Sequence, residues 1–254
     1  AFIGVVVLGK YSNYSAIAVS MSSVLVLVFT PLTSIIGHTY ISEREKTEQY
    51  FQWFYFLNFV LGVVFFIGYY AVIDDLVMIL FGNNLRLSKS VSFVITVNYF
   101  VQFMRQATLL FRDATGTFYN DRWKPLFEGL LNVILSITLV KILEGVGGDE
   151  LGVVGVIAAT IVTNLTICHI VEPYVLYKYA FQRSVKKHIF LNYIYILVFV
   201  IGVLATSALM RTYENSWIEL LVNGLISVGI SAVVIIVTTL FNKSARHWIK
   251  NKLK

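Results

Sequence analysis

Charged residues are scarce in this chain of 254 residues. Only 13% of the residues are Asp, Glu, Lys or Arg, and 57% are hydrophobic, whereas soluble domains carry about 25% charged residues. So few charges cannot cover a water-exposed globule, and a large part of the surface is expected to face lipid. The composition therefore excludes a soluble enzyme, a secreted disulfide scaffold and a disordered tail.

Cysteine, proline and catalytic motifs are also nearly absent. The single cysteine, Cys168, lies in an apolar run, so neither a disulfide framework nor a cysteine-based metal site can form. The sequence has no P-loop, no HExxH, no Cys/His cluster and no GxSxG. Because no convincing nucleophile or metal ligand set is present, we expect a carrier without a bound cofactor rather than an enzyme.

Long hydrophobic runs are abundant. A helix of about 20 apolar residues crosses a hydrocarbon core of about 30 Å. Seven stretches qualify, and they lack the strict alternation of barrel strands. We therefore predict an all-α integral membrane protein with about seven transmembrane helices. The predicted spans cover residues 11–36, 49–73, 90–111, 123–143, 151–176, 188–210 and 217–241.

The positive charge is distributed unevenly between the two sides of the predicted membrane. The net charge is +6, and in a membrane chain this excess indicates cytoplasmic connections rather than nucleic-acid binding. Of the 20 Lys and Arg residues, 14 lie in the C-terminal tail or in and beside the first, third and fifth connections, against 4 on the opposite side. The positive-inside rule thus predicts an external N-terminus and a cytoplasmic C-terminus. The basic tail, residues 243–254, is expected to lie on anionic lipid.

Polar residues of the third span share one helical face. Asn98, Gln102, Arg105 and Arg112 follow the spacing i, i+4, i+7 and i+14. Polar groups inside a membrane usually face the bundle interior or a cavity, and the arginine fork suits phosphate or carboxylate. The pattern predicts an anion-binding stripe that lines a water-filled cavity. The alternative is a snorkelling arginine beside amides that pack helices.

The fourth span also carries a polar face. Asp121, Glu128 and Asn132 are spaced i, i+7 and i+11, and Glu128 lies near Pro125, where a kink could free backbone groups. Glu128 either pairs with Arg105 or is a carboxylate that couples transport to H⁺ or Na⁺. A purely structural ion pair is the alternative.

Other polar residues of the spans are interpreted as structural. Hydroxyl and amide groups of the fifth span are expected to join helices, and its histidine to pack. Two tyrosines of the first span are expected to form an interfacial belt. Two aspartates at the outer end of the second span are expected to be solvated. The residues of the fifth span are Thr160, Thr163, Asn164 and His169. Those of the first span are Tyr11 and Tyr14, and the two aspartates are Asp74 and Asp75.

A family resemblance covers about residues 5–183. The segments that carry it are LGKYSNY at 8–14, Asn98-Tyr99, RDATGTF at 112–118, EGLLNVILSITL at 128–139, GVIAATI at 155–161 and EPYVLYK at 172–178. With these segments the chain resembles Wzx-like bacterial polysaccharide flippases of the multidrug/oligosaccharidyl-lipid/polysaccharide exporter superfamily. The GGDE segment at 147–150 departs from the family, because it lengthens an outer loop that is usually tight.

The resemblance implies a two-lobe bundle in the bacterial cytoplasmic membrane that moves undecaprenyl-pyrophosphate-linked oligosaccharides outward for capsule, exopolysaccharide or O-antigen synthesis. Residues 1–183 would form five spans of the C-terminal lobe, 184–242 two further helices, and 243–254 the tail. The chain begins with Ala1, and we expect a fragment whose N-terminal lobe is missing and which is inactive alone.

The resemblance also implies roles for the polar faces. Arg105 and Arg112 would attract the pyrophosphate or acidic sugars, and Glu128 would couple ions or pair with arginine. The amides of Asn98, Gln102 and Asn132 would bind sugar hydroxyls. Expected partners are the lipid-linked oligosaccharide, membrane lipids, the missing lobe, and polysaccharide polymerase and glycosyltransferases.

Three other functions are weaker interpretations of the sequence. A cation-coupled drug exporter of the same superfamily would need an apolar, aromatic cavity with a carboxylate and few arginines. The arginines of the third span argue against this function. A polysaccharide polymerase or ligase would need a large external loop, whereas the longest one predicted here is eight residues, 82–89. A seven-helix receptor has the same topology, but the family resemblance and the absence of disulfide cysteines argue against it.

Overall fold

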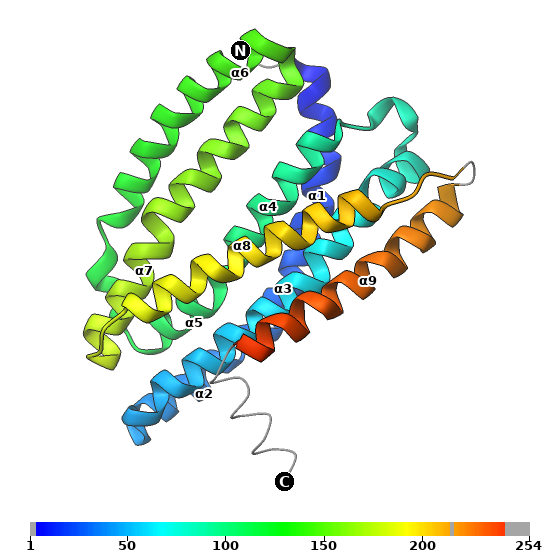
Figure 1. Cartoon of the computed structure of the whole chain (residues 1–254). Helices are drawn as coiled ribbons and strands as arrows, with labels where there is room; N and C mark the ends of the chain where they lie inside the picture. The colour runs from blue at the N-terminus through cyan, green and yellow to red at the C-terminus, as the bar shows by residue number, and fades with distance from the viewer. Residues whose placement is uncertain (1–3, 214–215, 242–254) are drawn as a thin grey trace.

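The computed structural model describes residues 4–213 and 216–241, and every regular element in these ranges is a helix (Figure 1). The predicted all-α fold is therefore confirmed for this part of the chain. The helices are α1 (Val5–Phe29), α2 (Leu32–Ser42), α3 (Arg44–Phe81), α4 (Lys89–Met104), α5 (Gln106–Ala114), α6 (Lys124–Thr163), α7 (His169–Val175), α8 (Lys186–Leu209) and α9 (Ser216–Phe241). Two 3₁₀ helices, η1 (Asn83–Leu85) and η2 (Thr117–Asp121), and two π-helices, η3 (Asn164–Cys168) and η4 (Leu176–Phe181), connect them.

Four helical segments of the described chain are long and apolar enough to cross a membrane. A fifth is added if α1 and α2, which meet at a bend of 44°, are counted as one span. The four are α3, the run Lys124–Phe181, α8 and Ser216–Leu240, which fits a multi-pass membrane protein. The count is below the predicted seven because α4 and α5 are separate short helices, and because two predicted spans fall in the run 124–181.

The long helix α6 is interrupted by a glycine pair. Gly147 (φ −147°) and Gly148 (φ 73°) depart from helical geometry, and the ribbon of α6 reverses direction at the top of Figure 1. The two halves pack closely, since a Cβ on Gly155 would lie 2.8 Å from the backbone of Leu139. A left-handed φ costs glycine little, so the GGDE segment forms a tight reversal rather than a long loop.

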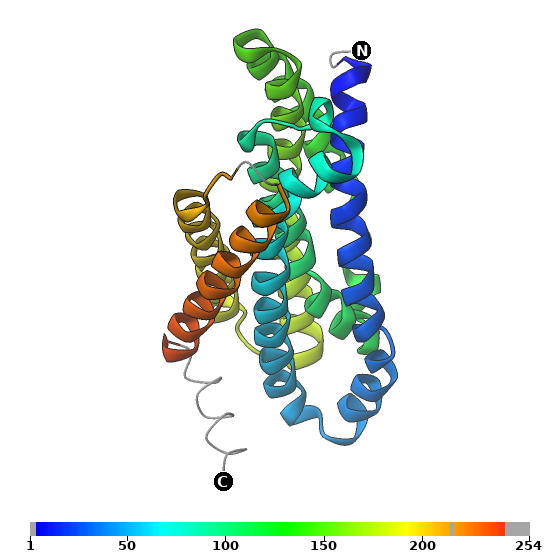
Figure 2. The same cartoon turned by 90° about the vertical axis from the view of Figure 1, so that its right-hand side faces the viewer.

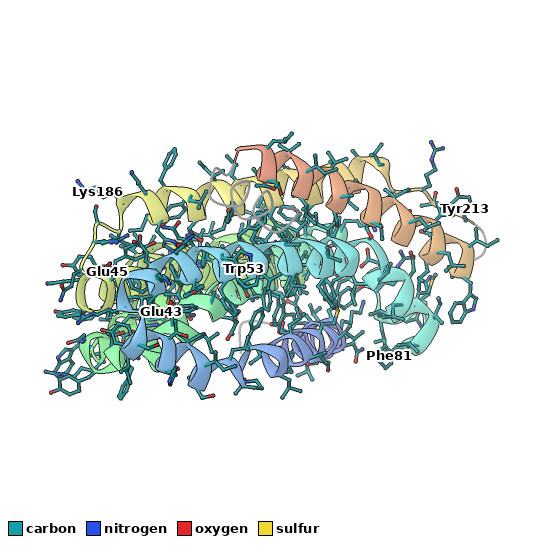
Figure 3. The ribbon with its side chains drawn as sticks, turned by 90° about the horizontal axis from the view of Figure 1, so that it is seen from below. Glu43, Glu45, Trp53, Phe81, Lys186 and Tyr213 are labelled. Atoms are coloured by element: carbon teal, nitrogen blue, oxygen red, sulfur yellow. The ribbon has the colours of Figure 1, made fainter. Side chains whose placement is uncertain are left out.

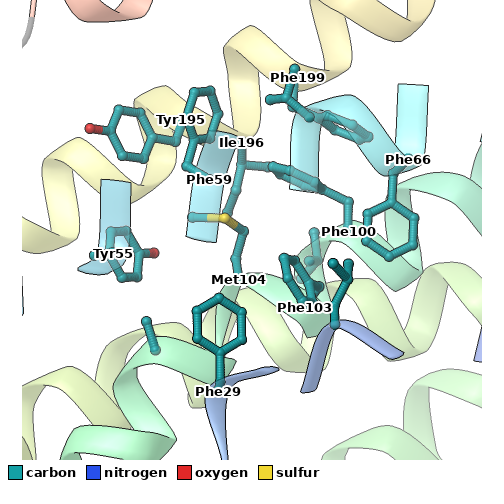
Figure 4. Packing of buried hydrophobic residues seen from close by; sticks show 14 of the residues in the cluster. Phe29, Tyr55, Phe59, Phe66, Phe100, Phe103, Met104, Tyr195, Ile196 and Phe199 are labelled. Atoms are coloured by element: carbon teal, nitrogen blue, oxygen red, sulfur yellow. The ribbon is translucent and has the colours of Figure 1, made fainter. Parts of the chain in front are cut away.

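The centre of the bundle is aromatic. The helix α3 packs against α4, α8 and α9, and Figure 2 shows it between α1 on one side and α8 with α9 on the other. Phe100 stacks on Phe199 with ring centroids 3.5 Å apart, and Phe59 stacks on Tyr195 at 4.2 Å (Figure 4). Buried rings of this kind supply much of the packing energy of a core, and here they fix α4 and α8 on α3.

The connections predicted to be cytoplasmic lie at one end of the bundle. Arg44 donates to the carbonyl oxygen of Ala180, 3.4 Å away, and Arg183 pairs with Glu48. The 3₁₀ helix η2 packs on η4 at the same end. In Figure 3 the labelled residues Glu43, Glu45 and Lys186 lie at this end, and Phe81 and Tyr213 lie at the other. We refer to the first as the basic end. The tail predicted to lie on the inner leaflet falls outside the described residues.

The second predicted span is too short. The helix α3 has 38 residues, about 57 Å at 1.5 Å per residue, and it continues eight residues beyond Ile73. Asp74 and Asp75 therefore lie inside a helix and are buried, so the expectation that they are solvated is wrong. Sequence hydropathy placed the helix end at these two charges, but neighbouring side chains neutralise both of them.

Candidate functional site

Arg105 lies at a break between two helices. The helix α4 ends at Met104 and α5 begins at Gln106. The amide of Arg105 donates to the carbonyl oxygen of Gln102 at 3.2 Å, three residues back, instead of continuing the four-residue ladder of an α-helix. The α-helical ladder is interrupted at this turn, so the stripe predicted from Asn98 to Arg112 does not follow one continuous α-helix.

The guanidinium of Arg105 is fully engaged by side chains from other helices. Its Nε and Nη2 donate to the two carboxylate oxygens of Glu172, at 3.1 and 2.5 Å. Its Nη1 donates to Asn164 Oδ1 at 2.6 Å and lies 3.7 Å from Glu128 Oε1. The forked pairing with Glu172 is the strongest hydrogen-bonding geometry available to arginine. The predicted pairing of Glu128 with Arg105 is confirmed, but Glu172 is the closer carboxylate.

A second cation, Lys124, completes the cluster. Its Nζ lies 2.5 Å from Glu172 Oε1 and 3.1 Å from Glu128 Oε2. The side chain of Glu172 is 1% exposed, that of Lys124 6%, Arg105 16% and Glu128 26%. We call these four residues and Asn164 the Arg105 cluster. It balances two positive with two negative charges, as a low-dielectric interior requires, and Glu128 is its most accessible member.

Irregular helix positions two members of the cluster. The π-helix η3 begins at Asn164, and the amide of His169 donates to the carbonyl oxygen of Asn164, five residues back. Pro173 follows Glu172 inside α7 and has no amide hydrogen for the helical ladder. The wider π turn rotates the residues that follow it, so Asn164 and Glu172 both reach Arg105. Single π segments of this kind are frequent at functional sites.

Arg112 belongs to a separate cluster near the basic end. Its Nη1 donates to Asp121 Oδ2 at 2.9 Å, and its Nη2 donates to Asp113 Oδ1 at 2.9 Å. Asp121 lies in η2, before α6 begins at Lys124, so the predicted face shared with Glu128 does not exist. Pro125 lies in the first turn of α6, where proline is tolerated, and the kink predicted there is not present.

The predicted amides have different surroundings. Asn132 Nδ2 donates to Thr160 Oγ1 at 3.2 Å and joins the two halves of α6, in agreement with the packing role predicted for Thr160. Asn98 is buried, and among the described residues no donor reaches its Oδ1. Gln102 is half-buried one turn before the break. The water-filled cavity along these residues stays a prediction.

The opposite end of the bundle has its own buried cluster. Asp74 Oδ1 accepts hydrogen bonds from Tyr14 at 2.9 Å and Ser92 at 2.7 Å, and its Oδ2 lies 2.8 Å from Lys89 Nζ. We call these four residues the Asp74 cluster. Tyr14 is completely buried, so assigning it to an interfacial belt is wrong. The neighbouring Asp75 lies 3.6 Å from Arg86.

Sequence reasoning missed three members of the Arg105 cluster. Glu172 is a carboxylate before a proline in an apolar run, and that was the available signal. The sequence indicates only a packing role for Asn164. Lys124 follows a charged connection and has the appearance of a loop charge in the sequence, although it is buried. His169, interpreted as packing, has its Nε2 3.0 Å from the carbonyl oxygen of Val101.

Comparison with known proteins adds no relative. No protein-family model, curated protein or solved structure matches the chain. Among the described residues, no three His, Cys, Asp or Glu side chains gather in a group that could hold a metal ion. A functional assignment therefore depends on the contacts of the Arg105 cluster and on the membrane character of the helices.

Proposed function

We propose that this chain is the C-terminal part of a flippase that carries lipid-linked oligosaccharides across a bacterial cytoplasmic membrane. The observation that supports the proposal is the Arg105 cluster, in which two cations and two carboxylates are largely buried. Three of these four charges belong to the run Lys124–Phe181, which is apolar enough to span a membrane. Ionisable groups at such positions are costly and mark substrate or ion pathways. The proposed protein is a carrier without catalytic activity.

A structural role alone explains the cluster less well. Buried ion pairs contribute little net stability, because desolvation of the charges offsets their attraction. Apolar side chains of similar volume would hold α4, α6 and α7 together without that cost. The helix break at Arg105 and the π turn at Asn164 also resemble the discontinuous helices at which transporters bind their substrates.

In the proposed cycle the substrate phosphates compete with carboxylates for the cations. Arg105 Nη1 and Glu128 Oε1 are 3.7 Å apart, beyond hydrogen-bonding distance, so Glu128 is the partner that an entering anion displaces first. Once displaced from Arg105, Glu128 would keep Lys124 as its partner, and protonation of its carboxylate or cation binding there would then couple ion movement to transport. Arg112, near the basic end, would attract the anionic substrate.

The proposed topology keeps seven spans. The two halves of α6 would cross separately, since they lie side by side after the reversal at Gly147 and Gly148. The pair α4 with α5, and the pair α1 with α2, would each be one broken span. The basic end would face the cytoplasm. An N-terminal lobe from the intact protein would cover the exposed face of the first half of α6.

The test measures polysaccharide export in cells of the organism that carries the gene, with the substitutions introduced into the intact gene. Arg105→Ala is expected to abolish export. Arg105→Ala also leaves Glu172 with one cation, which could destabilise the protein. A second variant, Arg105→Lys, keeps the positive charge but loses the forked pair of hydrogen bonds. For Arg105→Lys we expect about a tenfold loss of surface polymer at normal abundance in the membrane, because lysine cannot make the two parallel hydrogen bonds of the fork.

The matched control is Arg122→Ala. Arg122 is an exposed arginine near the basic end whose guanidinium lies over the Tyr119 ring, and its replacement should leave export unchanged. Normal surface polymer in both Arg105 variants would contradict the proposal. Loss of protection against cationic dyes with unchanged polymer would instead assign the chain to a drug exporter.

A further inference from the structure

A second polar feature, a cavity of about 580 Å³, opens at the basic end where η4 meets the start of α8. Its walls include Tyr174, Tyr177, Lys178, Arg183 and Lys186. We call it the basic cavity. A neighbouring cavity of about 350 Å³ shares Gln182 and Arg183 with it and extends toward Glu45 and Glu48 at the start of α3. The cavity shares no lining residue with the Arg105 cluster.

The charge of the basic cavity is one-sided. Three cations line it, and none of the described residues that line it is acidic. Arg183 is paired with Glu48, and Lys178 Nζ lies 5.4 Å from the centroid of the Tyr174 ring. Lys178 and Lys186 are both exposed. Such a surface attracts an anion with several acceptor oxygens, and a phosphate group is the commonest anion of this kind at a membrane.

The start of α8 adds to this field. Lys186 and Lys187 are in its first turn, with no acidic residue there, and the preceding Val185 provides no side-chain cap. The first turn of a helix carries partial positive charge and favours anions, so two lysines at this position repel the helix dipole. An anion bound in the cavity would relieve that repulsion and accept hydrogen bonds from the uncapped amides.

The position of the cavity favours a lipid as the source of the phosphate. The helix α8 is apolar enough to span a membrane and begins at the cavity. Phe190, one turn into α8, and Tyr174, on the cavity wall, both expose large aromatic surfaces. A phosphodiester headgroup in the cavity would leave its acyl chains beside α8, in the arrangement of basic lipid sites between membrane helices. We propose that the basic cavity binds the headgroup of one anionic phospholipid.

The experiment measures lipid binding to the full chain in neutral detergent by native mass spectrometry. Phosphatidylglycerol and phosphatidylcholine with the same acyl chains are titrated separately. We expect one phosphatidylglycerol per chain to bind at least tenfold more tightly than phosphatidylcholine. Lys178→Gln combined with Lys186→Gln should remove that preference, while Arg183 keeps its pairing with Glu48.

The matched control is Lys46→Gln combined with Arg122→Gln. It removes the same charge near the same end, but neither residue lines the cavity, so the preference should persist. Circular dichroism checks that both variants are folded, and Lys186→Gln alone replaces the double variant if it is not. Equal loss in the control, or equal binding of both lipids, would overturn the site. If millimolar inorganic phosphate displaced phosphatidylglycerol, the basic cavity would be a site for free phosphate and not for a lipid headgroup.

Discussion

The Arg105 cluster and the Asp74 cluster both bury charge, but their surroundings differ. Asp74 binds two neutral hydroxyls, those of Tyr14 and Ser92, and the exposed cation Lys89. It lies within the uninterrupted helix α3. The Arg105 cluster lies at a helix break and beside a π turn, and it consists of four mutually paired charges. Buried charge by itself therefore does not distinguish the two clusters, whereas the irregular backbone and the four paired charges of the Arg105 cluster do.

The largest effect on stability is expected for Glu172→Gln. This change leaves Arg105 and Lys124 buried with one remaining carboxylate, and breaking such a pair costs about 3–5 kcal/mol. Thermal unfolding in detergent measures the loss. Glu128→Gln removes the same charge from the same cluster, but Glu128 is partly exposed, and its loss should cost about 1 kcal/mol or less. Equal losses would show that the two carboxylates are equivalent.

A smaller effect is expected for Asp74→Ala. The buried Tyr14 hydroxyl loses its acceptor, which costs about 1–3 kcal/mol, whereas the Ser92 hydroxyl still has the Ser88 carbonyl oxygen 3.5 Å away. Lys89→Gln is the control in the same cluster. Because the Lys89 side chain is 54% exposed, its removal should cost about 1 kcal/mol or less. A larger loss for Lys89→Gln than for Asp74→Ala would mean that the ion pair, and not the hydroxyls, stabilises this end.

Composition and hydropathy are sufficient to predict the all-α fold. Together with the loop charges, they also predict which connections lie at the same end of the bundle. The site was only partly predictable. Arg105 and Glu128 stand out because each is a charge in an apolar run. Glu172 is 67 residues from Arg105, and a periodicity argument within one helix cannot connect residues so far apart.

The remaining errors share a physical origin. The break at Arg105 and the π turn at Asn164 depart from the ideal rotation of 100° per residue on which the face predictions rest, and both lie where side chains of different helices meet. Asp74 was misplaced for a related reason, since hydropathy treats an aspartate as solvated even where two hydroxyls and a lysine satisfy it. In each case tertiary partners decide the local structure.

The most direct test of the central claim is export per molecule of protein in the membrane, compared between Glu128→Gln and Asp74→Ala in the intact gene. The proposal predicts that Glu128→Gln, although nearly as stable as the wild type, loses export. Asp74→Ala, although less stable, should retain wild-type export for each molecule present. Export that follows abundance in both variants would contradict the claim and would reduce the Arg105 cluster to a structural contact.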